Sequence, residues 1–158
     1  MKNVMLGSEL MKIDKFKATE KVLYEYKSLD IKIKNIQIDI ETLKNDITLK
    51  AISYEERVGK TNAFSSSVEN EVIHREEHVQ MQIDRLESKL RYNQNLKIKI
   101  EGALSQLSDQ EMNLVRLRYF TKEHMTWLQV SYELGFEKNY CTQVRNKIIN
   151  KLSDFIYP

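Results

Sequence analysis

From Thr126 to Leu152 the chain reads TWLQVSYELGFEKNYCTQVRNKIINKL, and this stretch decides the fold of its last third. The pattern predicts one helix that begins at Thr126 and a second that runs from about Lys138 to Phe155. Gly135 stands where the chain must turn, and glycine accepts the left-handed conformation that such a turn commonly uses. Two helices joined in this way can lay the second helix in a DNA major groove.

The second of these helices is predicted to have two different faces. Its apolar stripe can close a small core with the preceding helix and turn through Cys141, Val144, Ile148, Leu152, Val130, Leu134 and Phe136. Between residues 138 and 151 the helix carries four cations and no carboxylate. Cations, amides and hydroxyls pair with phosphates and base edges. We therefore expect contacts with double-stranded DNA from Lys138, Asn139, Tyr140, Thr142, Gln143, Arg145, Asn146 and Lys147. A solvated face is the alternative, since short helical bundles also expose Lys and Asn.

A short helix is predicted just before this pair. Ser108 and Glu111 have the spacing of a capping box, in which each side chain satisfies a backbone amide at the helix start. Arg116 and Arg118 follow on the same helix, where they can reach DNA phosphates or simply face solvent. The sequence thus predicts a helix-turn-helix DNA-binding domain over residues 105–158.

Composition points to an all-α protein. Of the 158 residues 41% are hydrophobic and 30% charged, which is typical of a globular chain. One Pro and four Gly leave little room for a turn-rich β architecture. The formal net charge of +2 does not by itself indicate nucleic-acid binding. The single Cys excludes an internal disulfide, and with no signal peptide or membrane span in the pattern we expect a cytoplasmic protein.

The region 17–104 is predicted to form coiled-coil helices, after a flexible N-terminus at residues 1–16. Apolar residues alternate in steps of four and three over more than three heptads, which indicates a coiled coil: Val22, Tyr26, Leu29, Ile33, Ile36, Ile40, Leu43 and Ile47. A second stripe, Tyr24, Ile31 and Ile38, indicates further neighbours. We therefore expect a bundle or a homo-oligomer.

A loop is expected at residues 50–67, where this pattern breaks. Ser66 and Glu69 form another capping box, so a second helix should begin there. Its seam is Val72, Val79, Ile83, Leu86 and Leu90, then polar Asn93 and Lys97, then Ile100, Leu104 and Leu107. The two long helices can form an antiparallel hairpin or pair between chains, and both arrangements fit the pattern.

The C-terminal stretch resembles region 4 of bacterial sigma factors and its phage relatives. The segment LSDQEMNLVRLRYF looks like the L-S-x-x-E … L-R-Y-F helix of that family. Val130-Ser131 stands where Ile-Ala is usual, and Leu134-Gly135-Phe136 where Leu-Gly-Ile is usual. Ile148-Ile149 and Lys151-Leu152 stand where the family ends in Ala-Leu and Lys-Leu. Two positions depart from the family: Glu137 replaces the usual Ser cap of the recognition helix, and Cys141 replaces a core Val.

The rest of the chain narrows this resemblance. The segments KATEKVLYEYKSL and SYEERVGKTNAFSSSVENEVIHRE look like phage late-gene transcriptional regulators of the ArpU/RinA type. The resemblance implies a phage or prophage protein that binds DNA and switches on late or packaging genes. RNA polymerase is an open candidate for a further partner. The heptad half does not look like sigma region 2, so we do not expect a full sigma factor.

Two motifs suggest chemistry that the rest of the chain does not support. The segment His74 to His78 fits the H-x-x-E-H zinc pattern, but a catalytic site needs a third ligand and a pocket. Gly59-Lys60-Thr61 resembles the end of a P-loop, but Tyr54 stands where the first Gly is required. We therefore expect no enzyme, metal or cofactor.

Two other functions remain as alternatives to a DNA-binding regulator. Small terminase subunits, which package DNA, also join a helix-turn-helix to coiled-coil helices. An interaction protein without a DNA role would use the heptad arm alone.

Overall fold

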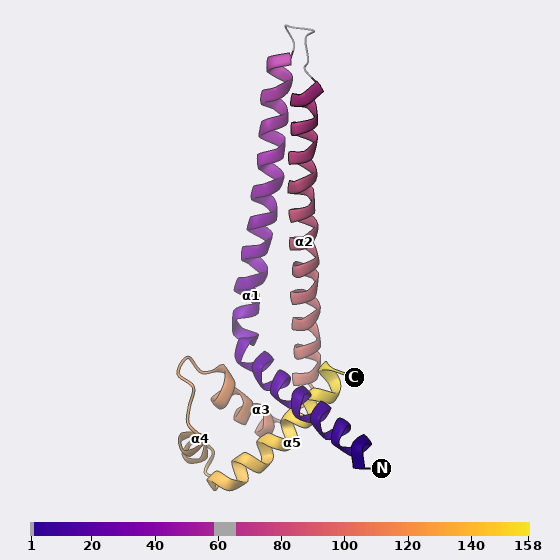
Figure 1. The fold of residues 1–158 in the computed structure, drawn as a ribbon. Helices are drawn as coiled ribbons and strands as arrows, with labels where there is room; N and C mark the ends of the chain where they lie inside the picture. Colours follow the sequence, from indigo (N-terminus) through magenta and orange to yellow (C-terminus); the bar gives the residue numbers. More distant parts are fainter. Residues whose placement is uncertain (1, 59–65) are drawn as a thin grey trace. The chain divides into compact units, whose positions relative to one another are not determined.

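The computed structural model describes residues 2–58 and 66–158, and side chains within 14–46 and 73–158. Every regular element in these ranges is helical, as predicted (Figure 1). The elements are α1 (Lys2–Val58), α2 (Ser66–Leu104), α3 (Asp109–Val115), the π-helical turn η1 (Arg116–Phe120), α4 (Trp127–Leu134) and α5 (Lys138–Ile156). Within the described ranges, no helix is both long and apolar enough to cross a membrane.

The chain divides into two compact units that differ from the predicted domains. Unit 1 contains residues 1–29 and 95–158, and unit 2 contains residues 30–94. The sequence placed the boundary at residues 104 and 105, between the heptad region and the C-terminal helices. The first part of α1 and the end of α2 instead belong with the C-terminal helices, because their buried side chains share one core with them.

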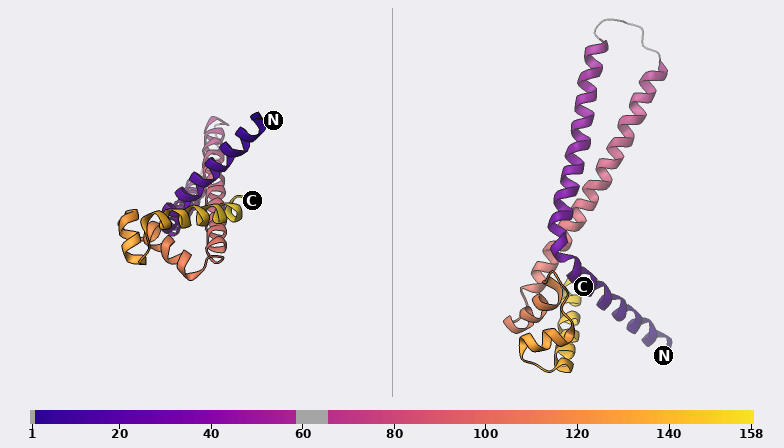
Figure 2. Two further views of the ribbon diagram at one scale, coloured as in Figure 1. Left: turned by 90° about the horizontal axis from the view of Figure 1, so that it is seen from below. Right: turned by 90° about the vertical axis from the view of Figure 1, so that its left-hand side faces the viewer.

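The core of unit 1 is contributed by all of its helices. Leu23 of α1, Ile100 of α2, Val115 of α3, Val130 of α4 and Ile148 of α5 are all at most 1% exposed and lie in one cluster. Figure 1 and the left view of Figure 2 draw α1 crossing α5 within this unit. Burial of these apolar side chains supplies the main free energy that holds the unit together.

Two predictions about α1 are wrong in the structure. The expected flexible N-terminus, residues 1–16, is helical from Lys2 onward, and Phe16 packs against the core of unit 1. Part of the expected loop at 50–67 is helical, since α1 continues to Val58 and α2 begins at Ser66. The apolar seam stops near residue 50, but residues 50–58 contain good helix formers and no Gly or Pro, so the helix continues. The P-loop-like Gly59-Lys60-Thr61 lies outside the described residues.

Unit 2 is a pair of helices with a small apolar core of its own. Ile36 and Ile40 of α1 and Ile83 of α2 are buried together, and the flanking seam residues Leu43, Val79, Leu86 and Leu90 pack against them. The segments run in opposite directions, as Figure 1 shows. Lys44 Nζ lies 2.9 Å from Glu87 Oε1 across the pair. The predicted second stripe behaves differently, because Ile31 and Ile38 are 61% and 58% exposed.

Short motifs in the sequence fix where the C-terminal helices begin and end. Ser108 with Glu111 forms the predicted capping box of α3, and Thr126 with Gln129 forms a second one at the start of α4. Gly135 ends α4 with φ of 67°, the left-handed conformation expected at this turn. The turn between α4 and α5 is therefore only residues 135–137.

Candidate nucleic-acid interface

The outer face of α5 is polar and free of carboxylates over residues 138–151. Most side chains predicted to contact DNA are exposed there: Lys138, Asn139, Tyr140, Gln143, Asn146 and Lys147, together with Asn150. We call these residues the outer face. Thr142 lies at its edge, half-buried, and its hydroxyl donates to the carbonyl of Lys138 at 3.0 Å. The outer face therefore offers amide groups and cations to solvent.

The opposite face of α5 is packed against unit 1. Cys141, Ile148, Ile149 and Leu152 are at most 1% exposed. Burial raises the pKa of the Cys141 thiol, so this side chain behaves as a small apolar residue. Phe136 is an exception to the predicted core, since it is 40% exposed and its ring lies 5.2 Å from the ring of Tyr140.

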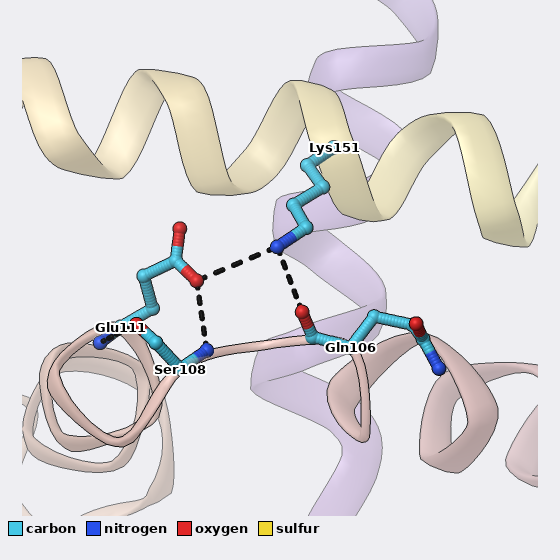
Figure 3. A network of polar contacts seen from close by, with 4 residues as sticks. All are labelled: Gln106, Ser108, Glu111 and Lys151. Carbon is cyan, nitrogen blue, oxygen red and sulfur yellow. Dashed lines mark hydrogen bonds and ion pairs between the residues drawn. The ribbon is translucent and has the colours of Figure 1, made fainter.

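Lys151 ties one flank of α5 to the junction of α2 and α3 (Figure 3). Its Nζ donates to the carbonyl of Gln106 at 2.7 Å and lies 3.5 Å from Glu111 Oε2. The same carboxylate accepts from the backbone amide of Ser108 at 2.9 Å, which completes the cap of α3. The amide of Ser108 is the main cause of the lowered pKa of Glu111, and the charge of Lys151 adds to it.

Glu111 should therefore make stability depend on acid pH. Because its pKa is lower in the folded state, its contribution is present above the unfolded value of 4.5 and is lost as pH falls through the folded value. We expect Glu111→Gln to remove about 0.5 kcal/mol near neutral pH, because glutamine can keep the bond to the Ser108 amide and only the charge at the helix start, facing Lys151, is lost. Urea unfolding at several pH values measures this. The loss of stability should shrink in acid. Glu123→Gln, at an exposed position, should change neither the free energy of unfolding nor its dependence on pH.

Arg145 leaves α5 on the flank away from Lys151 and does not join the outer face. Its Nη1 donates to Glu20 Oε1 of α1 at 3.1 Å. Its guanidinium carbon lies 5.4 Å from the ring centres of both Phe16 and Trp127. The side chain is only 20% exposed. The sequence placed Arg145 among the DNA contacts. Its contacts with Glu20 and the two rings direct it into unit 1, so we do not count it in the outer face.

Arg118 is also directed inward. Its Nη1 donates to the carbonyl of Met125, and its guanidinium carbon lies 4.9 Å from the Trp127 ring and 5.9 Å from the Tyr24 ring. The charge is thus stacked on aromatic faces, a stabilising arrangement for arginine. Arg116, two residues earlier in η1, is exposed and stays a candidate for phosphate contact.

One important residue of this region, Glu20, carried no signal in the sequence. Glu20 accepts hydrogen bonds from Arg145 and, at 2.6 Å, from the hydroxyl of Tyr119. Burial and this bond to Glu20 raise the pKa of Tyr119, so its hydroxyl stays a donor. Tyr24 packs edge-on against Tyr119, with ring centres 4.8 Å apart. The partners are separated by about a hundred residues of sequence, which no local pattern can connect.

The H-x-x-E-H segment of α2 does not form a cluster of ligands. His74 Nδ1 lies 3.5 Å from Glu77, and the two side chains are 80% and 65% exposed. In the part of the chain that the structure describes, no three His, Cys, Asp or Glu side chains are placed to hold a metal ion together.

Comparison with known proteins gives one family. No curated protein and no solved structure matches the chain. A family model described as "Protein of unknown function (DUF722)" matches residues 12–154, which includes parts of both units. The chain therefore belongs to the DUF722 family.

Proposed function

We propose that this protein is a sequence-specific transcriptional regulator that binds double-stranded DNA with α5. The observation that carries the proposal is the outer face, where exposed cations and amides lie on a stretch of α5, residues 138–151, that contains no carboxylate. Lys147 and Lys138 can neutralise phosphates. Gln143 and Asn146 can each bond adenine through two hydrogen bonds in the major groove.

The position of α5 within unit 1 supports this role. The helix follows α4 after a short turn, and its buried face is fixed to a common core. A helix held in this way presents its outer face as a rigid surface. In helix-turn-helix proteins the second helix enters the major groove while the first lies across the backbone. The resemblance to sigma region 4 assigns these two parts to α5 and α4.

The kind of regulator that we propose follows from the same resemblance. We propose an activator of phage or prophage late or packaging genes, of the ArpU/RinA type, that acts in the cytoplasm of a bacterial host without a catalytic step or cofactor. The helix pair of unit 2 would serve as an arm through which copies associate, since Ile31 and Ile38 expose apolar surface along α1. In a symmetric dimer two recognition helices would meet half-sites about one helical turn apart, or a multiple of it.

Selection from genomic DNA tests this proposal. Purified protein is mixed with fragments of bacterial and prophage DNA, and the retained fragments are sequenced. We expect a few fragments to be enriched, and their affinity to fall steeply as salt rises, because bound phosphates release counterions. Equal retention of all fragments, or none, would contradict sequence-specific binding.

Substitutions on the outer face then test the assignment of α5. Gln143→Ala and Asn146→Ala should each reduce the preference for the enriched fragment over a shuffled one by roughly tenfold, within the range for one base contact. Lys147→Ala should weaken binding to both duplexes and lower the salt slope by about 1. Gln110→Ala and Lys99→Ala are matched controls at exposed positions of α3 and α2. Unchanged affinity in all three α5 variants would remove α5 as the recognition helix.

A further inference from the structure

The one tryptophan of the chain is in contact with two arginines. Trp127 begins α4, and the guanidinium carbons of Arg118 from η1 and Arg145 from α5 lie 4.9 Å and 5.4 Å from its ring centre. A guanidinium over an indole face is held by the ring's negative quadrupole, and the attraction grows when the pair is shielded from water. These contacts therefore join η1, the start of α4 and α5 to one another.

Glu20 fixes Arg145 to α1. Its Oε1 lies 3.1 Å from Arg145 Nη1 and 2.6 Å from the Tyr119 hydroxyl. The side chains of Arg145 and Glu20 are 20% and 26% exposed. A carboxylate this shielded needs its donors, and removing one partner leaves the other with an unpaired polar group. The Arg145 side chain is therefore held in one direction.

The fixed position of the Arg145 side chain restricts which way the outer face of α5 points. Arg145 and Lys151 leave α5 on the two sides of the buried stripe that contains Ile148, because successive residues turn by about 100° around a helix. Lys151 is bound to Gln106 and Glu111, and Arg145 to Glu20. Attachments on both sides resist rotation of α5 about its own axis. Such a rotation would change the direction in which Asn146, the neighbour of Arg145, points from the outer face.

We infer that Glu20 and Arg145 are positioning residues for DNA reading, which fix the rotation of α5 without touching DNA. This inference rests on the proposed function. Its consequence is that α1, a helix with no part in the predicted recognition motif, determines how well that motif reads sequence. The pair acts on the preference between duplexes, since a rotated helix keeps its phosphate-binding cations but misplaces its amides.

Three variants test this inference: Glu20→Gln, Arg145→Met and the two together. Affinity is measured for the enriched fragment and for a shuffled duplex of about three helical turns, over a range of salt and well below the unfolding midpoint. We expect each single variant to reduce the preference for the enriched fragment roughly fivefold, and the double variant no further, since contacting residues are coupled. The salt slope should not change, because no phosphate contact is lost.

The sign of the Glu20→Gln effect separates positioning from simple electrostatics. Removing a carboxylate near DNA should by itself strengthen binding to both duplexes alike, because attraction to phosphates does not depend on sequence, so a loss of preference identifies a geometric role. Asp14→Asn, an exposed carboxylate of α1 in the same unit, is the matched control and should not reduce the preference. Trp127 fluorescence should change in the Arg145 variants and stay constant in the control.

Different outcomes overturn different statements. A salt slope reduced by about 1 in Arg145→Met, with no change in Glu20→Gln, would make Arg145 a phosphate contact and overturn the inference. An unchanged preference in both single variants would overturn it as well. Absence of duplex binding by the unchanged protein would overturn the proposed function and this inference together, whereas the other outcomes leave the proposed function standing.

Discussion

Leu23→Asp is expected to unfold unit 1. Leu23 is fully buried and belongs to the cluster that includes Ile100, Val130 and Ile148 from three other helices. Truncation of such a leucine to alanine costs about 3 kcal/mol, and an aspartate adds the cost of a buried charge without a partner. A loss of this size is comparable with the whole stability of a small domain.

Urea unfolding followed by Trp127 fluorescence measures this effect, because Trp127 packs against the same core. Leu23→Ala should lower the midpoint, and Leu23→Asp should abolish the transition. Lys17→Ala, at an exposed position of the same helix, should leave it unchanged. If Leu23→Asp kept a normal transition, α1 would not be part of the core of unit 1. The same reasoning predicts that residues 105–158 alone do not fold.

Ile83→Asp is expected to separate the helices of unit 2. Ile83 is 2% exposed, and within the described residues it lies in a cluster with only Ile36 and Ile40 as further buried members. Because this core is small, no other apolar contacts can replace those of Ile83. The loss of stability in unit 2 should therefore reach several kcal/mol. In proteins most helical stability comes from tertiary packing, so helices that lose their packing also lose helix content.

Circular dichroism and fluorescence together test this second effect. Helix content, measured by circular dichroism, should fall in Ile83→Asp. Unit 1, followed by Trp127 fluorescence, should unfold at its usual midpoint, because the two cores share no buried residue. Met81→Asp is the control, because Met81 is 52% exposed on the same helix. Loss of the Trp127 transition in Ile83→Asp would mean that the two units fold as one.

The heptad pattern predicted part of the helix packing. Leu29, Ile36 and Ile40 are buried as expected, but Leu23 and Thr19, which lie outside the pattern, are buried too. The reason is that α1 contributes to two cores, and the face that is buried in unit 1 differs from the one that is buried in unit 2. A single repeat cannot describe a helix that changes partners.

The face of α5 was predictable because it depends on local periodicity. The buried residues Cys141, Ile148 and Leu152 recur at helical spacing, and that spacing places the polar residues opposite them. The roles of Arg118 and Arg145 were not predictable. An arginine in a polar sequence looks solvent-exposed until its carboxylate and aromatic partners are known, and Glu20 lies 125 positions away from Arg145.

The burial of Cys141 has a consequence for handling the protein and for its chemistry in the cell. The thiol is inaccessible and its pKa is raised, so little of the reactive thiolate is present. Oxidants and alkylating reagents therefore reach it only when α5 detaches from the core. The rate at which the Cys141 thiol is modified therefore reports how often unit 1 opens spontaneously. Disulfide cross-links between copies can form only between molecules that have already opened.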